Sequence, residues 1–387
     1  MPSANTQSHV VELDALRGIA IFGVVMTHVV NSLGMMGNNL PLINLDITQF
    51  LNTGGLGVQL FFLLSGFLLT TTETRRYASG TGNLGDYVRR RFLRLAPAYY
   101  LALCLALVFA LWNNIYHPAM NIGVDLALYL TFLHGLAFGN HSDLDPAYWS
   151  LTCEVVFYAA LPFVLRLARP LSVRLLWYAA TLGLAAGVYF WWATMSSVEL
   201  RFYLIFHPFA HLHLFLAGSL LAGLAERRTR GRGLSLPAAS GDFLLLVALA
   251  GITLNAYVNN PAPLAQVVSR LGTETLVAVG FAAYVLGSPL LKAILALPGL
   301  AALGRISYSI YLFHGLLMGL AEKAGSVRLL HQWAAEGVPH LALFTLYMAA
   351  TLLVVVPVCT LSYYWVELPG MRAFRRLSPR ASLSPAA

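Results

Sequence analysis

Long apolar runs constrain this chain more than any other feature of its sequence. Hydrophobic residues make up 58% of its 387 residues and charged residues only 10%, whereas a soluble domain carries about 25% charged residues. Apolar runs of about 20 residues are long enough to cross the hydrocarbon core of a bilayer as helices. The sequence therefore predicts an all-α, polytopic membrane protein.

About ten such runs predict about ten transmembrane helices, at residues 14–33, 54–73, 95–112, 150–168, 173–193, 202–224, 241–258, 271–289, 303–321 and 340–364. The segment 122–138 is also apolar. We expect it to be re-entrant or interfacial, because an extra span there would break the alternation of basic loops described next. The spans predict one transmembrane domain over residues 1–370, followed by a basic, disordered cytoplasmic tail over residues 371–387.

Basic residues alternate between the two ends of the predicted spans. All but four of the 24 lysines and arginines fall on one side; the four exceptions are Arg201, Arg270, Lys323 and Arg328. The positive-inside rule places the basic side, and with it both termini, in the cytoplasm. This topology accounts for the formal net charge of +8, so the charge gives no reason to expect a nucleic-acid partner.

The cysteines and histidines do not form a metal-binding or disulfide pattern. The three cysteines, Cys104, Cys153 and Cys359, all lie in apolar runs, and an odd number there argues against a disulfide framework. The sequence contains neither a C-x-x-C nor an H-E-x-x-H motif. We therefore expect no metal. We also expect no cleavable signal peptide, because no basic region precedes the first apolar run.

The first predicted span carries two ionisable residues on one face. Arg17 and His28 are eleven residues apart, close to three helical turns, which offsets them by roughly 16 Å along the axis. Ionisable side chains within a membrane are costly and usually mark a site or a pathway. Histidine, with an unperturbed pKa of about 6.5, suits a general base. The alternative for His28 is a structural hydrogen bond, and Asp14 is expected to offset the charge of Arg17.

An arginine-rich segment, residues 89–94, precedes the third predicted span. Most such segments only anchor the protein at the cytoplasmic surface. Arg91 and Arg94, however, are neighbours on one helical face, and guanidinium groups match phosphate oxygens well. These two residues are therefore candidates for binding a phosphorylated cofactor.

Further polar residues lie within the predicted spans. Glu154 lies about one turn into the fourth span, where a carboxylate needs a partner; it either orients His28, as a triad acid does, or makes a structural hydrogen bond. Tyr311 and His314 are placed to line a polar cavity. Ser65 precedes a glycine and is better explained by close helix packing than by nucleophilic chemistry. Hydrogen-bonded packing is the favoured explanation for the histidines of the sixth span, His207, His211 and His213.

Six short motifs occur in order between about residue 10 and residue 370: Arg17-x10-His28, FFLLSGF at 61–67, RRFLRLAP at 90–97, WSLTCEVVFY at 149–158, SYSIYLFH at 307–314 and Glu367-Leu368-Pro369. Together they resemble the membrane acyltransferase-3 family. This family comprises O-acyltransferases that modify bacterial surface polysaccharides and some antibiotics.

The resemblance implies a ten-helix core in the bacterial cytoplasmic (inner) membrane. It would move an acyl group, expected to be acetyl, from cytoplasmic acyl-CoA to a hydroxyl of an extracytoplasmic or membrane-associated carbohydrate. By position, His28 corresponds to the essential histidine and Arg17 to its paired basic residue. Arg91 and Arg94 match the R-x-x-R motif associated with acyl-CoA use, and Glu154 matches the acidic residue of the fourth-span motif.

Arg17 is expected to serve the donor rather than the chemistry. Its offset along the helix keeps it from contacting the same atom as His28, so we assign it, with Arg91 and Arg94, to acyl-CoA binding. Asp14, Tyr311 and His314 are assigned to the substrate pathway. The role of His314 is less well supported by the motif, because Gly315 and Leu316 follow it where many family members have Trp-Pro.

Other acceptors and one other class of function remain open. Many polysaccharide-modifying members carry a C-terminal esterase-like domain, which we do not expect here, so a macrolide or similar secondary metabolite is an alternative acceptor. A homo-oligomer is compatible with either. Intramembrane histidine, arginine and glutamate would also suit a proton-coupled exporter, although no inverted repeat with matching broken spans is visible.

Overall fold

The computed structural model describes residues 4–34, 41–42, 45–113, 122–137, 144, 147–167, 170–231, 237–258 and 260–377. Over these residues the chain is almost entirely helical. The elements are α1 (Ala4–Ser32), β1 (Pro41–Leu42), β2 (Leu45–Asp46), α2 (Thr48–Asn52), η1 (Thr53–Leu56), α3 (Gly57–Ala78), α4 (Leu84–Trp112), α5 (Ile122–Leu130), η2 (His134–Leu136), α6 (Trp149–Leu167), α7 (Leu171–Thr194), α8 (Val198–Phe206), α9 (Pro208–Thr229), α10 (Ala238–Ala256), α11 (Pro263–Leu286), α12 (Pro289–Leu295), α13 (Leu300–Arg305), α14 (Ser307–Lys323), α15 (Ser326–Ala335), α16 (His340–Ser362), the π-helical turn η3 (Tyr363–Glu367) and α17 (Leu368–Leu377).

The prediction of a polytopic all-α membrane protein is confirmed. Among the described residues, eight helices are long and apolar enough to cross a bilayer, and α11 with α12, bent by 95°, makes a ninth. These nine coincide with nine of the ten predicted runs. The remaining run, 303–321, is interrupted at Ile306 between α13 and α14. As a result α14 is only 17 residues long, at the lower end of the length that spans a membrane.

The segment 122–138 does not form a span, as predicted. Its helix α5 has nine residues, which extends about 14 Å at 1.5 Å per residue and is too short to cross the bilayer core. At the other end of the chain, α17 continues to Leu377. The predicted domain boundary at residue 370 therefore falls within a helix, and residues 378–387 lie outside the described part of the chain.

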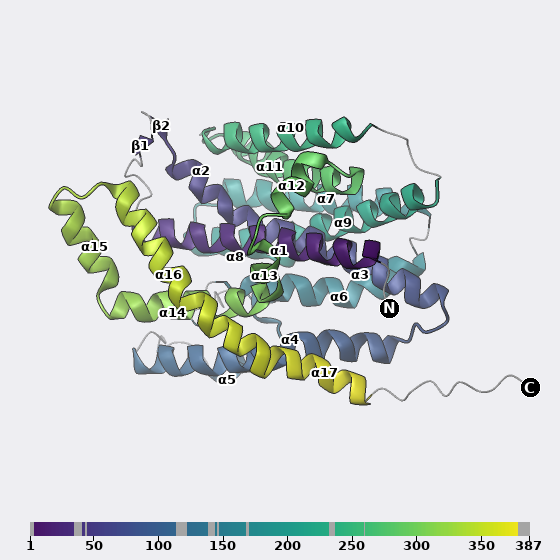
Figure 1. Ribbon diagram of the computed structural model, residues 1–387, viewed down its shortest axis with the longest axis horizontal. Coiled ribbons are helices and arrows are strands. Elements are labelled where there is room, and N and C mark those ends of the chain that lie inside the picture. The colour runs from purple at the N-terminus through teal and green to yellow at the C-terminus, as the bar shows by residue number, and fades with distance from the viewer. Residues whose placement is uncertain are drawn as a thin grey trace, which may run out of the picture.

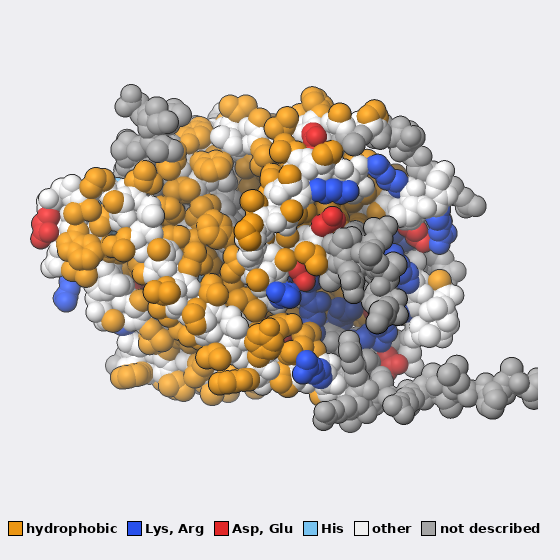
Figure 2. Space-filling view, viewed as in Figure 1, with side chains coloured by type: hydrophobic (Ala, Val, Ile, Leu, Met, Phe, Trp, Pro, Cys, Tyr) orange, Lys and Arg blue, Asp and Glu red, His pale blue; other side chains and the backbone are white. Residues whose placement is uncertain are grey.

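The long helices run side by side as a bundle (Figure 1). The start of α1 and the end of α17 lie toward one end of this bundle, and α15 and the β1–β2 hairpin lie at the opposite end. On the face drawn in Figure 2, lysine and arginine side chains gather toward the end where α1 begins, and hydrophobic side chains cover the middle. This separation matches the alternation of basic loops in the sequence.

Small residues let the central helices approach closely. A Cβ atom on Gly66 of α3 would lie 2.0 Å from the carbonyl oxygen of Phe215, and one on Gly218 of α9 would lie 2.1 Å from that of Leu63. Both distances are shorter than a van der Waals contact, so these positions admit only glycine without movement of the backbone. The interpretation of the Ser65-Gly66 pair as a packing feature is consistent with this contact.

Candidate active site

Two cavities meet inside the bundle. The His28 cavity, of about 470 Å³, is lined by His28, Gln59, Trp149 and Arg270, among others. The Arg17 cavity, of about 70 Å³, is lined by polar and charged side chains that include Arg17, Ser65, Arg94, Ser150 and Glu154. Val58 and Tyr311 line both. The two cavities therefore adjoin at these two side chains.

Helix α1 runs past both cavities and supplies the key residue of each. Arg17 and His28 lie on the same face, as the spacing predicts, but they open into different cavities. The start of α3 packs directly on α1 between them: a Cβ on Gly57 would lie 2.1 Å from the carbonyl oxygen of Ala20. This close approach places Val58 and Gln59 at the wall of the His28 cavity.

His28 packs against His314 of α14. Their rings meet edge to face, with centroids 4.8 Å apart and an interplanar angle of 71°. His314 is fully buried, and its Nδ1 donates to the carbonyls of Ile310 (3.0 Å) and Tyr311 (2.9 Å). A proton on Nδ1 makes Nε2 an acceptor, and among the described residues Nε2 has no partner. Neither nitrogen of His28 hydrogen-bonds to a described residue, so its lone pair is available at the cavity.

Tyr311 is fixed at the junction of the cavities. Its hydroxyl donates to the carbonyl of Ala147 and lies 2.6 Å from Oγ of Ser150. Since the single phenolic proton goes to the carbonyl, Ser150 is the donor in the second hydrogen bond. These contacts join α14 to the start of α6 and hold the phenol ring between the two cavities.

Glu154 belongs to the Arg17 cavity and not to the His28 cavity. Its Oε1 accepts hydrogen bonds from Ser65 Oγ at 3.1 Å and from the hydroxyl of Tyr158. The structure therefore does not place Glu154 as a triad-like partner of His28. It lies instead in the same small cavity as Arg17 and Arg94, where it is an opposing charge for both.

Arg17 also has a second acidic neighbour. Its Nη1 lies 3.2 Å from Oδ1 of Asp14, and the two side chains are 21% and 16% exposed. The expected charge pairing within α1 is therefore formed. Because Arg17 is only partly exposed and contacts the cavity as well, this pair fixes the guanidinium group at the cavity wall.

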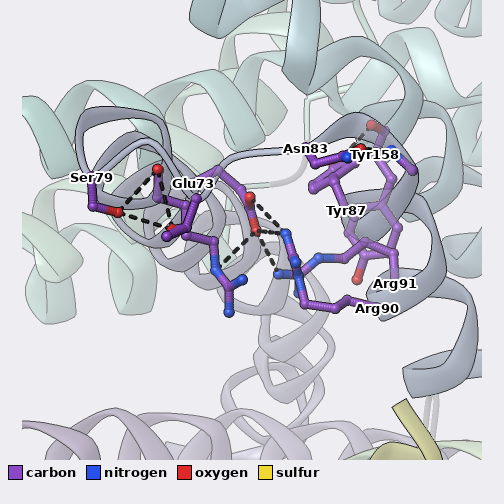
Figure 3. A network of polar contacts seen from close by, with 10 residues as sticks. Glu73, Ser79, Asn83, Tyr87, Arg90, Arg91 and Tyr158 are labelled. Atoms are coloured by element: carbon purple, nitrogen blue, oxygen red, sulfur yellow. Dashed lines mark hydrogen bonds and ion pairs between the residues drawn. The ribbon is translucent and has the colours of Figure 1, made fainter. Parts of the chain in front are cut away.

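The two arginines of the R-x-x-R motif lie in different surroundings. Arg94 lines the Arg17 cavity, whereas Arg91 is bound to Glu73 on α3, with Nη2 3.4 Å from Oε1. Glu73 is buried and also pairs with Arg90 at 3.0 Å and with Arg76 at 4.0 Å. We call these four residues the Glu73 cluster (Figure 3). The guanidinium group of Arg91 also lies 5.7 Å from the ring centroid of Tyr87 and 5.9 Å from that of Tyr158.

Sequence reasoning missed several buried polar residues, among them Glu73, Glu274 and Gln59. Glu274 of α11 is 1% exposed, and its Oε2 lies 3.1 Å from Nε2 of His213. A lone carboxylate in an apolar run, the signal that identified Glu154, was equally present at Glu274. Nε2 of His211 donates to the carbonyl of Ile205 at 2.9 Å, as expected for a packing histidine.

The segment after α5 is tied to the bundle by hydrogen bonds. Nε2 of His134 hydrogen-bonds to the carbonyl of Tyr148 at 2.9 Å, and the Tyr148 hydroxyl donates to the carbonyl of Leu312. Burial lowers the pKa of His134 to about 4, so the ring stays neutral. Within the described residues, no group of three or more histidine, cysteine, aspartate or glutamate side chains is arranged to hold a metal ion, and the three cysteines are free.

The chain matches a known protein family over most of its length. Residues 10–363 match the acyltransferase-3 family, described as an acyltransferase domain. The chain is 27% identical to acyltransferase MdmB of Streptomyces mycarofaciens over 394 residues, which cover 96% of this chain and 94% of that protein. It is 28% identical to O-acetyltransferase OatA of Staphylococcus aureus over 165 residues, 40% of this chain and 24% of OatA.

A third relative is YrhL of Bacillus subtilis, named as a candidate peptidoglycan O-acetyltransferase. It is 28% identical over 173 residues, which cover 41% of this chain and 24% of that protein. No solved structure matches the chain. The match to the family extends over both cavities and over nearly all of the helical bundle, and the chain therefore belongs to the acyltransferase-3 family.

Proposed function

We propose that the chain is an acyl-CoA-dependent O-acyltransferase of the bacterial cytoplasmic membrane, which transfers an acetyl group to a carbohydrate hydroxyl. The observation that carries this proposal is the junction of the two cavities at Val58 and Tyr311. One cavity is lined by Arg17 and Arg94, and the other is lined by a histidine with an available lone pair. Donor and acceptor would meet at this junction.

His28 is the proposed general base. It would take the proton of the acceptor hydroxyl as that oxygen attacks the thioester carbonyl. The tetrahedral intermediate would then collapse with cleavage of the carbon–sulfur bond, and the departing thiolate of CoA would take the proton from the imidazolium. His314 Nε2, an acceptor held by two backbone carbonyls on the opposite side of its ring, would stabilise the imidazolium that forms.

Arg17 and Arg94 would bind the donor close to its reacting end. A cavity of about 70 Å³ has room for an acetyl group or a few water molecules, and not for a nucleotide. The two guanidinium groups would hydrogen-bond carbonyl oxygens of the pantetheine arm next to the thioester, and so contribute to donor binding. The size of the cavity is our reason for favouring acetyl over longer acyl groups.

The Glu73 cluster would bind the phosphates of the donor. Three arginines around one carboxylate leave an excess of positive charge within the cluster, and guanidinium groups bind phosphate oxygens in bidentate geometry. In this proposal Arg91, in the Glu73 cluster, would bind a donor phosphate. Arg94, which lines the Arg17 cavity, would contact the donor closer to His28. Tyr311 would shape the path to His28 directly, whereas Asp14 and His314, which line neither cavity, would act through their contacts with Arg17 and His28.

The proposed acceptor is a carbohydrate, free in the envelope or attached to a lipid or metabolite. The names of OatA and YrhL describe O-acetyltransferases, one of them acting on peptidoglycan. A glycosylated macrolide offers the same hydroxyl chemistry and is the alternative acceptor. The family match favours acyl transfer over the proton-coupled exporter considered from the sequence.

The proposal is tested by consumption of the thioester. The purified protein in lipid nanodiscs is given acetyl-CoA and a mixture of bacterial envelope carbohydrates, with free CoA followed by a thiol reagent and esters followed by mass spectrometry. We expect one ester on the acceptor for each CoA released, and much slower turnover with palmitoyl-CoA. Acceptor movement across a vesicle membrane without release of CoA would instead establish an exporter.

A further inference from the structure

A second, polar pocket adjoins the His28 cavity. It has a volume of about 310 Å³ and shares Thr53, Gln59, Arg270 and Thr273 with that cavity. The rest of the wall consists of Trp192 of α7, the polar side chains of Asn255, Gln266, Ser269 and Glu274, and the apolar side chains of Leu56, Ile252 and Ala256. A volume near 300 Å³ is typical of a small-ligand site. We call this space the polar pocket.

Gln59 is a buried polar residue without a complete set of partners. Only 7% of it is exposed, and its Oε1 atom has no hydrogen-bond partner among the described residues. Buried amide oxygens are almost always hydrogen-bonded, and an exception calls for an explanation. Gln59 lines both the polar pocket and the His28 cavity, so a ligand that spans the two would satisfy this oxygen.

Arg270 is held in place by aromatic rings and a buried carboxylate. Its guanidinium carbon lies 5.0 Å from the ring centroid of Tyr189 and 5.8 Å from that of Trp192. Tyr189 in turn donates to Glu274 Oε1 at 2.7 Å. The Nε atom of Arg270 has no hydrogen-bond partner among the described residues. The side chain is thus positioned by its surroundings while one donor remains unused.

The other polar side chains of the wall already have partners. Asn255 Nδ2 donates to the carbonyl of Ser269 at 2.8 Å and to the hydroxyl of Thr273, and Ser269 Oγ donates back to Asn255 Oδ1 at 3.2 Å. Gln266 donates to the carbonyl of Pro261. The contacts of Asn255 brace α10 against α11. Gln59 and Arg270 each keep an atom without a hydrogen-bond partner among the described residues, whereas Oε2 of Glu274 faces Nε2 of His213 at 3.1 Å.

The chemistry of this pocket fits a sugar ring. It offers an amide acceptor, a guanidinium donor and part of the indole ring of Trp192, which together suit a molecule that has both hydroxyl groups and apolar carbon–hydrogen groups. An acyl chain would leave the polar atoms unsatisfied. A strongly anionic ligand would be repelled by the carboxylate of Glu274, which lines the pocket together with Arg270.

We propose that the polar pocket binds the sugar ring that carries the acceptor hydroxyl, through Gln59, Trp192 and Arg270, and holds it against His28. This inference rests on the proposed transfer at His28. The sugar could belong to a polysaccharide or to a glycosylated small molecule, because both present the same ring to the pocket.

The test measures binding separately from transfer. The intact protein in nanodiscs is applied to an array of bacterial oligosaccharides and polysaccharide fragments, and its affinity for a glycosylated macrolide is compared with that for the aglycone. The variants are Gln59→Leu, Arg270→Met and Arg270→Lys; the last keeps the charge beside Glu274 in case Arg270→Met does not fold. Gln332→Leu and Arg328→Met, on the exposed side of α15, are the matched controls.

We expect the wild-type protein to bind at least one sugar-bearing probe. Gln59→Leu and Arg270→Lys should weaken that binding at least tenfold, and the two α15 controls should leave it unchanged. With the sugar identified as an acceptor, Gln59→Leu should raise its KM more than it lowers kcat. Array binding identifies a polysaccharide source, and binding of the macrolide but not its aglycone identifies a glycosylated metabolite.

Three results would overturn the inference: no sugar-bearing probe binds the wild-type protein, the aglycone binds as tightly as the glycosylated macrolide, or the pocket variants keep wild-type affinity. The variant His28→Ala separates this inference from the proposed function. It should still bind the sugar while losing transfer. Retained transfer in His28→Ala would refute the proposed function and leave the binding result standing.

Discussion

His28 and His314 meet edge to face with their ring centroids 4.8 Å apart at the wall of the larger cavity. The two residues come from motifs near opposite ends of the sequence, on α1 and α14. His314 presents no free N–H, because its Nδ1 proton is used by the carbonyls of Ile310 and Tyr311. It can therefore accept a hydrogen bond from a protonated His28 but cannot donate one.

The variant His314→Phe tests this arrangement. It keeps an aromatic ring of similar shape against His28 but removes the acceptor at Nε2. We expect kcat to fall by about 10- to 100-fold, less than the loss of a proton-transfer group itself, which is about 100- to 10,000-fold, with little change in the KM of acetyl-CoA. Steady-state kinetics with a folded, nanodisc-embedded variant provides the measurement. A wild-type kcat would show that His314 only fills space.

Arg17→Met tests the assignment of Arg17 to the donor. The guanidinium group lines the small cavity and is paired with Asp14. Loss of a charge-assisted hydrogen bond costs about 1.5–3 kcal/mol, so the KM of acetyl-CoA should rise by about tenfold or more and by a larger factor than kcat falls. Lys323→Met, an exposed change at the end of α14, is the control. A fall in kcat with an unchanged KM would move Arg17 to the chemical step.

Arg91→Gln tests whether the Glu73 cluster binds phosphate. The KM of acetyl-CoA should rise severalfold at low ionic strength and less at high ionic strength, because salt screens exposed charges. Arg228→Gln is the comparison, since Arg228 lines a separate cavity of about 710 Å³ together with Arg75, Arg174 and Lys292. If Arg228→Gln has the larger effect on KM, the donor phosphates bind in that separate cavity.

Glu73→Gln tests the stability of the cluster itself. Glu73 is 1% exposed and faces three arginines, and removal of one partner from a buried ion pair costs about 3–5 kcal/mol. We expect a clear fall in the thermal unfolding temperature of the detergent-solubilised protein. Glu226→Gln removes the carboxylate of an exposed pair with Arg230, which is worth about 1 kcal/mol or less. Equal effects of the two substitutions would contradict the structural role given to Glu73.

Gln59→Leu is expected to separate stability from function. The side-chain oxygen of Gln59 is buried and unpaired, which costs about 1–3 kcal/mol of desolvation. Leucine is apolar and of similar size, so the substitution removes this cost. The variant should therefore unfold at a temperature equal to or higher than the wild type while it loses affinity for the acceptor. A marked loss of stability would mean that Gln59 serves the packing of α3.

The spans were predictable because their signal is local. A helix in lipid must satisfy its own backbone hydrogen bonds, so an apolar run of sufficient length specifies its structure without reference to the rest of the chain. The prediction that 122–138 does not span followed from a different signal, the alternation of basic loops. The interruption at Ile306 followed from neither signal, because the break depends on how α13 packs against α1, where a Cβ on Gly304 would lie 1.6 Å from the carbonyl oxygen of Asp14.

The site was only partly predictable because its contacts are between distant segments. The sequence identified Arg17, His28, Glu154 and His314 as costly polar residues, but it could not say which of them touch. Glu154 contacts Ser65 and Tyr158 in place of His28. Arg91 and Arg94 are neighbours on one helix but have different surroundings. Arg91 pairs with Glu73 of α3, whereas Arg94 lines the Arg17 cavity. The sequence could not identify Gln59 as a candidate ligand-binding residue. Its importance depends on a buried side-chain oxygen without a hydrogen-bond partner among the described residues, which only the structure reveals.

The central claim is that His28 performs the proton transfer at the junction of the two cavities, and His28→Ala tests it most directly. The measurement is acceptor-dependent release of CoA from acetyl-CoA by the folded variant in nanodiscs, with thermal unfolding as the check on folding. We predict a loss of at least about 100-fold, as for removal of a general base, at an unchanged unfolding temperature. Release of CoA at the wild-type rate would contradict the account.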